Sequence, residues 1–270
     1  MMGTDARVTA EHPVKATPKR RWLQFSLRTL LVLMLVFGAV FGWFAREVQQ
    51  ARAQREAANA IEKLGGRVAW EHVSGGMIRT AVAWVGGLLG EDLSGGVVNV
   101  SLADIQVTDA GLEHLRELTK LWHLNVSGTQ VTDAGLEHLR GLTELRDLLL
   151  SGTPVTDAGL VHLQELTQLG YLDLTNTQVT DAGLVHLTGL AQLWWLDLSN
   201  TQVTDAGLEH LRGLTKLRHL NVSGTHVTDA GLAHLWGLTK LGHLDLRSTQ
   251  VTDAGVNELK KALPNVQIRR

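Results

Sequence analysis

The apolar residues in the second half of the chain recur with one fixed period. The phrase Val-Thr-Asp-Ala-Gly occurs seven times between Val107 and Gly255, and each copy begins 24 residues after the previous one. Leucine and valine hold the same places in nearly every copy, and polar residues fill most places between them. A strict period of this length predicts a solenoid, in which each 24-residue coil stacks on its neighbours and shares a core with them.

One unit, residues 121–144, indicates which elements each coil contains. Leu124 and Val126 alternate with polar residues, which is typical of a short strand. Thr132 or Asp133 then caps a short helix. Three leucines in this helix follow one another at a spacing of three residues, so they form one buried face.

Two small residues in the same unit have predicted structural roles. Thr129 lies where the chain leaves the strand, and its hydroxyl can satisfy a backbone group inside the coil. Gly135 lies in the helix, and we expect it to permit the close approach of the neighbouring coil.

The pattern L-x-x-L-x-L-x-x-T-x-V-T-D-A-G-L-x-x-L-x-x-L resembles a leucine-rich repeat, and it is most similar to the F-box-associated, cysteine-containing variety. It departs from that variety by using threonine where other classes have Asn or Cys. The resemblance covers residues 97–268. It implies an α/β leucine-rich-repeat solenoid, a horseshoe with parallel strands on the concave face and short helices on the convex face. We therefore expect residues 65–96 to be an N-terminal cap, and residues 97–270 to be the repeat domain with a shortened C-terminal coil.

Residues 29–45 (TLLVLMLVFGAVFGWFA) form an apolar run without a charge. At about 1.5 Å per residue, these 17 residues reach roughly 26 Å as a helix, the short end of a membrane span. Trp22 and Trp43 lie near its two ends, where indoles favour the headgroup region of a bilayer. We expect a single-pass transmembrane helix in contact with lipid; the alternatives are a cleaved signal peptide and a buried core helix.

The flanks of this run suggest its orientation. Residues 1–28 form a basic tail with a net charge of +4, and five basic residues precede the run whereas three follow it closely. This bias favours a cytoplasmic N-terminus and an extracytoplasmic repeat domain. Residues 46–64 are good helix formers that end at Gly65-Gly66, which predicts a juxtamembrane helical stalk. The anchor and this segment together resemble bacterial membrane-anchored leucine-rich repeat proteins of unassigned role.

Composition excludes several classes of function. The chain has no cysteine, which rules out a disulfide scaffold, a thiol nucleophile and a Cys-ligated metal. Residues 29–270 carry a net charge of −6, which argues against nucleic acid as a partner. The sequence lacks a phosphate-binding loop, a G-x-S-x-G motif and an H-E-x-x-H motif. We therefore expect a protein that is not an enzyme and that needs no cofactor.

Six histidines recur at the repeat spacing on the outer side of the predicted helices. A metal site needs ligands that converge, and repetition of one unit accounts for a single line of histidines, so we expect no metal site. These histidines are His114, His138, His162, His186, His210 and His234.

The informative positions vary while the repeat frame stays constant. They lie between the strand leucines, so we expect them to point outward on the concave face. Trp, Tyr and Arg are enriched in the hot spots of protein interfaces, which predicts a partner-binding patch. Acidic residues beside the aromatic ones favour a ligand with basic and apolar groups. The predicted patch comprises Trp122, His123, Arg146, Asp147, Tyr171, Asp173, Trp194, Trp195, Asp197, Arg218 and His219.

Two alternatives to these interpretations stay open. The two adjacent tryptophans, Trp194 and Trp195, could fill space against neighbouring coils, and the strand register could slip by one residue. The leading functional hypothesis is a membrane-anchored, non-catalytic protein that binds a protein or peptide ligand through the concave face. The alternative is a substrate-binding adaptor of an F-box-like ubiquitin ligase, although residues 1–96 offer no F-box-like module.

Overall fold

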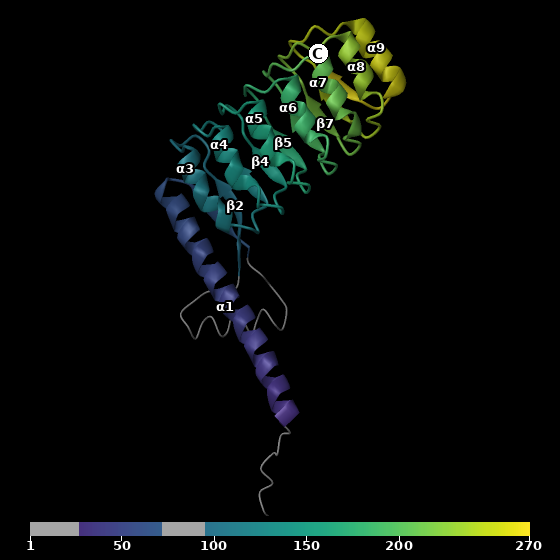
Figure 1. The fold of residues 1–270 in the computed structure, drawn as a ribbon. Coiled ribbons are helices and arrows are strands. Elements are labelled where there is room, and N and C mark those ends of the chain that lie inside the picture. Colours follow the sequence, from purple (N-terminus) through teal and green to yellow (C-terminus); the bar gives the residue numbers. More distant parts are fainter. Residues whose placement is uncertain (1–26, 72–94) are drawn as a thin grey trace, which may run out of the picture. The chain divides into compact units, whose positions relative to one another are not determined.

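The computed structural model describes residues 27–71 and 95–270 (Figure 1). The chain divides into two compact units, Met1–Ala45 and Arg46–Arg270. Most of the predicted basic tail and residues 72–94 of the predicted cap lie outside the described residues.

In the first unit, residues 27–45 belong to the long helix α1, Leu27–Lys63. One 18-residue window of this helix has a mean hydropathy of 2.0, and none of that window is buried. Among the described residues, α1 is the one helix long and apolar enough to cross a membrane. The exposure of this apolar stretch argues against the alternative of a buried core helix.

The second unit includes the C-terminal half of α1, which differs from the predicted stalk. Ala57, Ala58 and Ile61 are buried and belong to the same core cluster as the repeat leucines. Gln54 is also buried, and Gln50 Nε2 donates a hydrogen bond to Thr119 Oγ1 at 3.1 Å. The last turns of α1 therefore pack on the first coil of the solenoid and bury their apolar residues in its core.

The end of α1 explains the Gly65-Gly66 pair. Gly65 has a φ of +91°, which a glycine adopts without strain. Its N–H bonds to Glu62 O at 2.9 Å, and the N–H of Gly66 bonds to Ile61 O at 3.0 Å. These two contacts form a Schellman motif, which satisfies the last helical carbonyls. A Cβ at Gly66 would lie 2.6 Å from a methyl carbon of Leu102, so the tight packing at this turn also requires glycine.

The strands of the second unit form one nine-stranded sheet in chain order. The first strand pairs antiparallel with the second, and every later pair is parallel. Parallel partners are 24 residues apart, as in Leu172 opposite Leu196, so the predicted register is confirmed. The strands are β1 Arg67–Trp70, β2 Val97–Ser101, β3 His123–Asn125, β4 Asp147–Leu149, β5 Tyr171–Asp173, β6 Trp195–Asp197, β7 His219–Asn221, β8 His243–Asp245 and β9 Gln267–Arg269.

Short helices follow one another along the opposite side of the coils (Figure 1). Each of the first six coils has one α-helical turn that continues as a 3-10 helix, whose three residues per turn match the spacing of the leucines. The α-helices are α3 Asp109–Leu112, α4 Asp133–Leu136, α5 Asp157–Leu160, α6 Asp181–Leu184, α7 Asp205–Glu209, α8 Asp229–Leu232 and α9 Asp253–Ala262. The 3-10 helices are η1 Glu113–Glu117, η2 Glu137–Leu139, η3 Val161–Leu163, η4 Val185–Leu187, η5 His210–Gly213 and η6 Ala233–Leu235.

A hydrogen-bonded ladder joins the helix starts of successive coils. Asp157 Oδ1 accepts the backbone N–H of Thr180 at 2.8 Å, and Asp157 Oδ2 accepts the hydroxyl of the same threonine at 2.6 Å. The same pair of contacts links each of the first six motif aspartates to the threonine 23 residues later, at 2.5 to 2.8 Å. Thr180 Oγ1 also accepts the N–H of Ala182 at 3.3 Å, so threonine, and not aspartate, is the helix cap.

The glycine of the motif makes room for this ladder. A Cβ at Gly159 would lie 2.5 Å from Asp133 Oδ1, the atom that accepts the N–H of Thr156. The close approach predicted for Gly135 is confirmed, because a Cβ there would lie 2.5 Å from Asp109 Oδ1. The predicted role of Thr129 is also confirmed: its hydroxyl donates to Val126 O at 2.6 Å, inside the coil.

Removing one ladder carboxylate should destabilise the solenoid. Asp181→Ala leaves the N–H of Thr204 without its partner, and we expect the free energy of unfolding to fall by about 1–3 kcal/mol. The matched control is Asp253→Ala, at the same motif position. Its side chain is 92% exposed and contacts Arg270, so the loss there should stay under about 1 kcal/mol. Urea unfolding of residues 46–270 measures both losses, and equal values would contradict the ladder.

The assignment of buried and outer faces has a second test. Leu184 is fully buried between two coils, and Leu184→Ala should cost about 2–5 kcal/mol because it leaves a cavity. His186 is partly exposed, and only Gln164 contacts its Nδ1, at 2.7 Å. His186→Ala should therefore cost less than about 1 kcal/mol in the same urea experiment. Similar losses at the two positions would show that the helix is rotated from the orientation described.

Candidate functional site

The side chains that point away from the core on strands β2–β9 form the surface predicted as the concave face, here called the strand face. Its residues lie in two columns because parallel partners are 24 residues apart. The first column runs through His123, Asp147, Tyr171, Trp195, His219 and His243. Side chains in both columns are partly buried or exposed, whereas the leucine between them on each of strands β3–β8 is buried.

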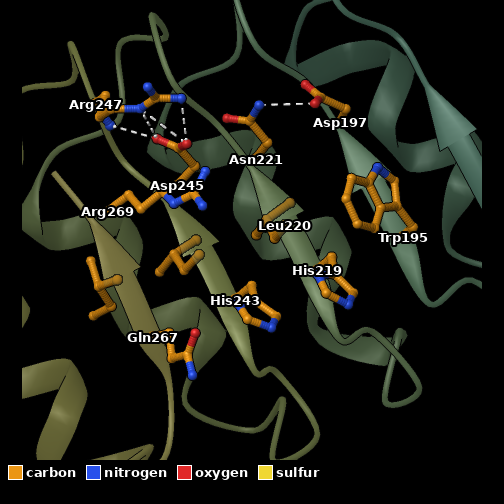
Figure 2. A pocket seen from close by; sticks show the side chains of 12 residues that line it. Trp195, Asp197, His219, Leu220, Asn221, His243, Asp245, Arg247, Gln267 and Arg269 are labelled. Carbon is orange, nitrogen blue, oxygen red and sulfur yellow. Dashed lines mark hydrogen bonds and ion pairs between the residues drawn. The ribbon is translucent and has the colours of Figure 1, made fainter.

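Four aromatic rings of the first column stack on one another. Trp195 lies parallel to Tyr171, with ring centroids 5.3 Å apart and an interplanar angle of 14°. His219 stacks on the other face of Trp195 at 4.5 Å, and His243 stacks on His219 at 4.5 Å. Figure 2 shows the last three rings on successive strands. The spacing follows from the sheet, because neighbouring strands lie about 4.8 Å apart.

Trp194 stands beside this aromatic stack. Its ring meets those of Tyr171, Trp195 and His219 edge-on, each with centroids 6.0 Å apart. Gly170 leaves the space for this indole, since a Cβ there would lie 2.8 Å from the Trp194 ring. Trp194 remains 40% exposed, so it presents a large apolar surface to solvent.

The side chain of Trp195 is less exposed than we expect of a residue that binds a partner. It is partly buried between its two stacking neighbours, and its Nε1 is buried without a hydrogen-bond partner. The space-filling alternative therefore describes part of its role. Trp194 is therefore the more exposed of these two tryptophans.

The second column consists of the residues two positions after the first column on each strand. Its polar side chains make local hydrogen bonds where their strands end. Asp173 and Asp197 each accept the backbone N–H of the residue two positions on, at 2.9 Å. Asn221 does the same at 3.0 Å, and its Nδ2 donates to Asp197 Oδ2 at 2.8 Å. The acidic residues predicted to select a basic ligand are thus partly committed to the structure of the repeat.

A hollow of about 570 Å³ lies on the strand face between β6 and β9 (Figure 2). Trp195, Asp197 and His219 of the predicted patch line it. Residues of the predicted patch that lie on or before β5, such as His123, do not line it; His123 instead contacts Asp147 Oδ2 at 3.3 Å. Prediction of the site missed Leu220, Asn221, His243, Leu244, Asp245, Arg247, Gln267, Ile268 and Arg269.

The far side of the hollow carries a bidentate ion pair. Arg247 Nε donates to Asp245 Oδ1 at 2.9 Å, and the Arg247 NH2 group donates to Oδ2 at 2.7 Å. Burial opposes ionisation of Asp245, but the hydrogen bonds from Arg247 outweigh it and lower the pKa of this carboxyl below its usual range. This pair keeps that side of the hollow close to neutral.

Two titratable rings of the stack respond to their surroundings in different ways. Burial, followed by the nearby charges of Asp173, Asp197 and Asp147, raises the pKa of Tyr171. Burial, followed by the positive charges of His243 and Arg218, lowers the pKa of His219. The charges that act on Tyr171 at β5 are therefore negative, whereas those that act on His219 at β7 are positive.

The histidine column on the helix side makes contacts between coils. Arg140 Nε donates to His162 Nδ1 at 2.9 Å, and an Arg212 guanidinium nitrogen lies 2.5 Å from His234 Nδ1. Among the described residues, no group of three or more His, Cys, Asp or Glu side chains is placed to hold a metal ion.

Comparisons with known proteins agree with this architecture. A family model described as Leucine Rich repeat matches residues 117–139, 213–235 and 237–259. A search of curated proteins finds no match to this sequence. Among solved structures, the chain is similar to an internalin C2 from Listeria monocytogenes, with 29% identity and a TM-score of 0.53, over 68% of this chain and 79% of that chain. Together with the 24-residue coils, these matches support a leucine-rich-repeat type of fold for the solenoid.

Proposed function

We propose that this chain is a membrane-anchored, non-catalytic interaction protein whose strand face binds a protein or peptide. The observation that carries the proposal is the row of stacked rings with the exposed Trp194 beside it. The buried leucines already fill the core, so these large rings are not needed to close it. Aromatic residues on an exposed, hollowed surface favour a binding role.

The dimensions of the strand face favour an extended ligand. The rings from Tyr171 to His243 span three strand spacings of about 4.8 Å each, or roughly 14 Å. The adjoining hollow is open, whereas a small metabolite is usually enclosed by its pocket. A peptide or the edge of a protein would cover both features together.

The exposed apolar stretch of α1 supports the anchor. A soluble protein rarely leaves a long run of leucine, valine and phenylalanine in contact with water, and a bilayer would cover it. The basic residues before this run support a cytoplasmic N-terminus and an extracytoplasmic repeat domain. The F-box-type alternative has no support from the matched family or from the similar structure.

Site-directed photo-crosslinking in native membranes tests the binding face. A benzophenone amino acid placed at Tyr171, on the strand face, should form a covalent adduct with the partner. The same amino acid at His186, on the helix side, is the control and should form none. Adducts from His186 alone would place the binding surface on the helices and would contradict the proposal.

Trp194→Ala should weaken binding of the partner captured in this way. Loss of an exposed interface tryptophan costs about 2 kcal/mol or more, or roughly a 30-fold rise in Kd. The matched control is Trp236→Ala, since Trp236 is 51% exposed but follows the 3-10 helix η6 on the opposite side. Calorimetric titration measures both changes. An unchanged Kd for Trp194→Ala would remove this residue from the interface.

The membrane anchor predicts the behaviour of the whole chain during extraction. The full chain should stay with the membrane fraction in high salt and in alkaline carbonate, because an apolar helix within the bilayer is not held by charge. Residues 46–270 should be recovered in the soluble fraction. Release of the full chain by carbonate would disprove the anchor.

A further inference from the structure

We propose that the edge of the strand face where strands β6–β8 begin is the docking site for an acidic peptide segment of the partner. This inference rests on the proposed binding function of the strand face. It names the charge that the partner must carry at one place on that face.

Two adjoining hollows form this edge. The first, of about 550 Å³, is lined by Gln192, Trp194, Lys216, Arg218 and Lys240. The second, of about 450 Å³, is lined by Arg218, Lys240, His219, Gly242 and His243. Because both hollows share Arg218 and Lys240, they form one continuous cationic groove.

The three cations of the groove are not neutralised within the described part of the chain. Lys216 Nζ donates to the neutral Gln192 Oε1 at 2.5 Å, and none of the ion pairs among described residues involves Lys216, Arg218 or Lys240.

Arg247, on the same face, differs from these cations because it pairs with Asp245. Among the described residues, no Asp or Glu side chain lines either hollow, so a carboxylate bound in the cationic groove would meet no acidic side chain in its lining.

The second hollow holds the ring of His219. This ring is packed between Trp195 of β6 and His243 of β8, with Trp194 edge-on. Burial lowers the pKa of His219, and the nearby His243 and Arg218 lower it further. An anionic group bound in this groove would reverse that effect, because it would favour the charged imidazolium.

A peptide fits this groove better than a free inorganic anion does. The exposed Trp194 ring lines the first hollow beside the cations, so the site offers apolar surface together with positive charge. A carboxylate side chain with an apolar neighbour uses both, whereas phosphate or sulfate would leave the indole uncovered. The groove spans β6 to β8, roughly 10 Å at about 4.8 Å per strand, which suits three residues of extended chain at about 3.3 Å each.

The position of the groove also revises the predicted charge of the ligand. Asp147, Asp173 and Asp197 lie on β4, β5 and β6, and none of them lines the groove. The sequence suggested a ligand with basic and apolar groups, and that expectation applies to the part of the strand face outside the groove. A partner that covers the whole face would place its acidic segment over β6–β8.

The test uses the full chain in uncharged detergent and three fluorescently labelled peptides of equal length. The acidic probe is acetyl-Glu-Leu-Glu-Leu-Glu-amide, and the neutral and basic probes carry Gln or Lys in place of Glu. Fluorescence anisotropy should show that the acidic probe binds at least about tenfold more tightly than the other two. Its affinity should fall as salt rises, because screening weakens exposed charge pairs.

Two variants in the groove and one control variant locate the binding site of the acidic probe. The double variant Arg218→Glu with Lys240→Glu should weaken its binding at least about tenfold, and Arg218→Gln should give a smaller loss in the same direction. Arg116→Glu makes a single charge reversal on η1, on the helix side, and should change binding less than about twofold. Far-UV circular dichroism checks that each variant is folded.

Each contrary outcome overturns the inference. Equal binding of the neutral probe would remove the role of charge, and full binding by the double variant would place the acidic site elsewhere. Inorganic sulfate that displaces the probe at an equal concentration would indicate a small-anion site and not a peptide site. If the acidic probe fails while crosslinking from Tyr171 persists, the docking inference alone is wrong. If the probe binds and Tyr171 yields no adduct, the proposed function fails instead.

Discussion

The contact between an aspartate of one coil and a threonine of the next is the interaction on which the rest of this structure depends. One carboxylate accepts both the N–H and the hydroxyl of the same threonine, so it fixes the distance and the rotation between two coils together. The hydrogen bonds from Thr252 lower the pKa of Asp229, so this one contact favours the ionised carboxylate. The support from Asp229 is present at neutral pH and is lost as the pH falls below the usual carboxyl range.

The ladder accounts for the constancy of the Val-Thr-Asp-Ala-Gly phrase. Thr180 both donates to the previous coil and caps its own helix, and Gly183 leaves room for the carboxylate of Asp157. Because the helix starts stack without slippage, the strands on the other side are held in register as well. Equivalent residues then meet across the strands, so aromatic residues at one repeat position form a stack without any separate device to align them.

Most of the fold could be predicted from the sequence, because a strict period of 24 residues implies that each residue pairs with the residue 24 positions later. The core leucines and the hydroxyl of Thr129 are where the pattern places them. The hydrogen bonds from each aspartate to the threonine of the next coil could not be predicted. The two residues lie 23 positions apart, and only the geometry of stacked coils brings them together. The left-handed turn residue of each coil also passed unnoticed, although Gly128, Gly152 and Asn176 are residue types that tolerate positive φ.

The candidate site was predicted less well, because residue type alone does not show how much of a side chain its neighbours bury. Trp195 and Trp194 are neighbours in sequence, yet only Trp194 presents a large surface to solvent. The hollow lies further toward β9 than expected, since Arg269 of the second column and Arg247, which follows β8, both reach it. The cationic groove depends on cations that have no anionic partner among the described residues, and a sequence shows where cations are but not which of them are paired.

The same reasoning applies to the start of the repeat domain. Residues 46–64 have small apolar residues at irregular spacing, which suggested an independent stalk. Ala57, Ala58 and Ile61 are buried in the same core cluster as the repeat leucines, so this segment packs on the solenoid although its apolar residues are few and mostly small. The helix that carries the apolar run is therefore continuous with the helix that packs on the core. Residues 46–270 form one compact unit, so the last turns of α1 belong with the repeats and not with a separate stalk.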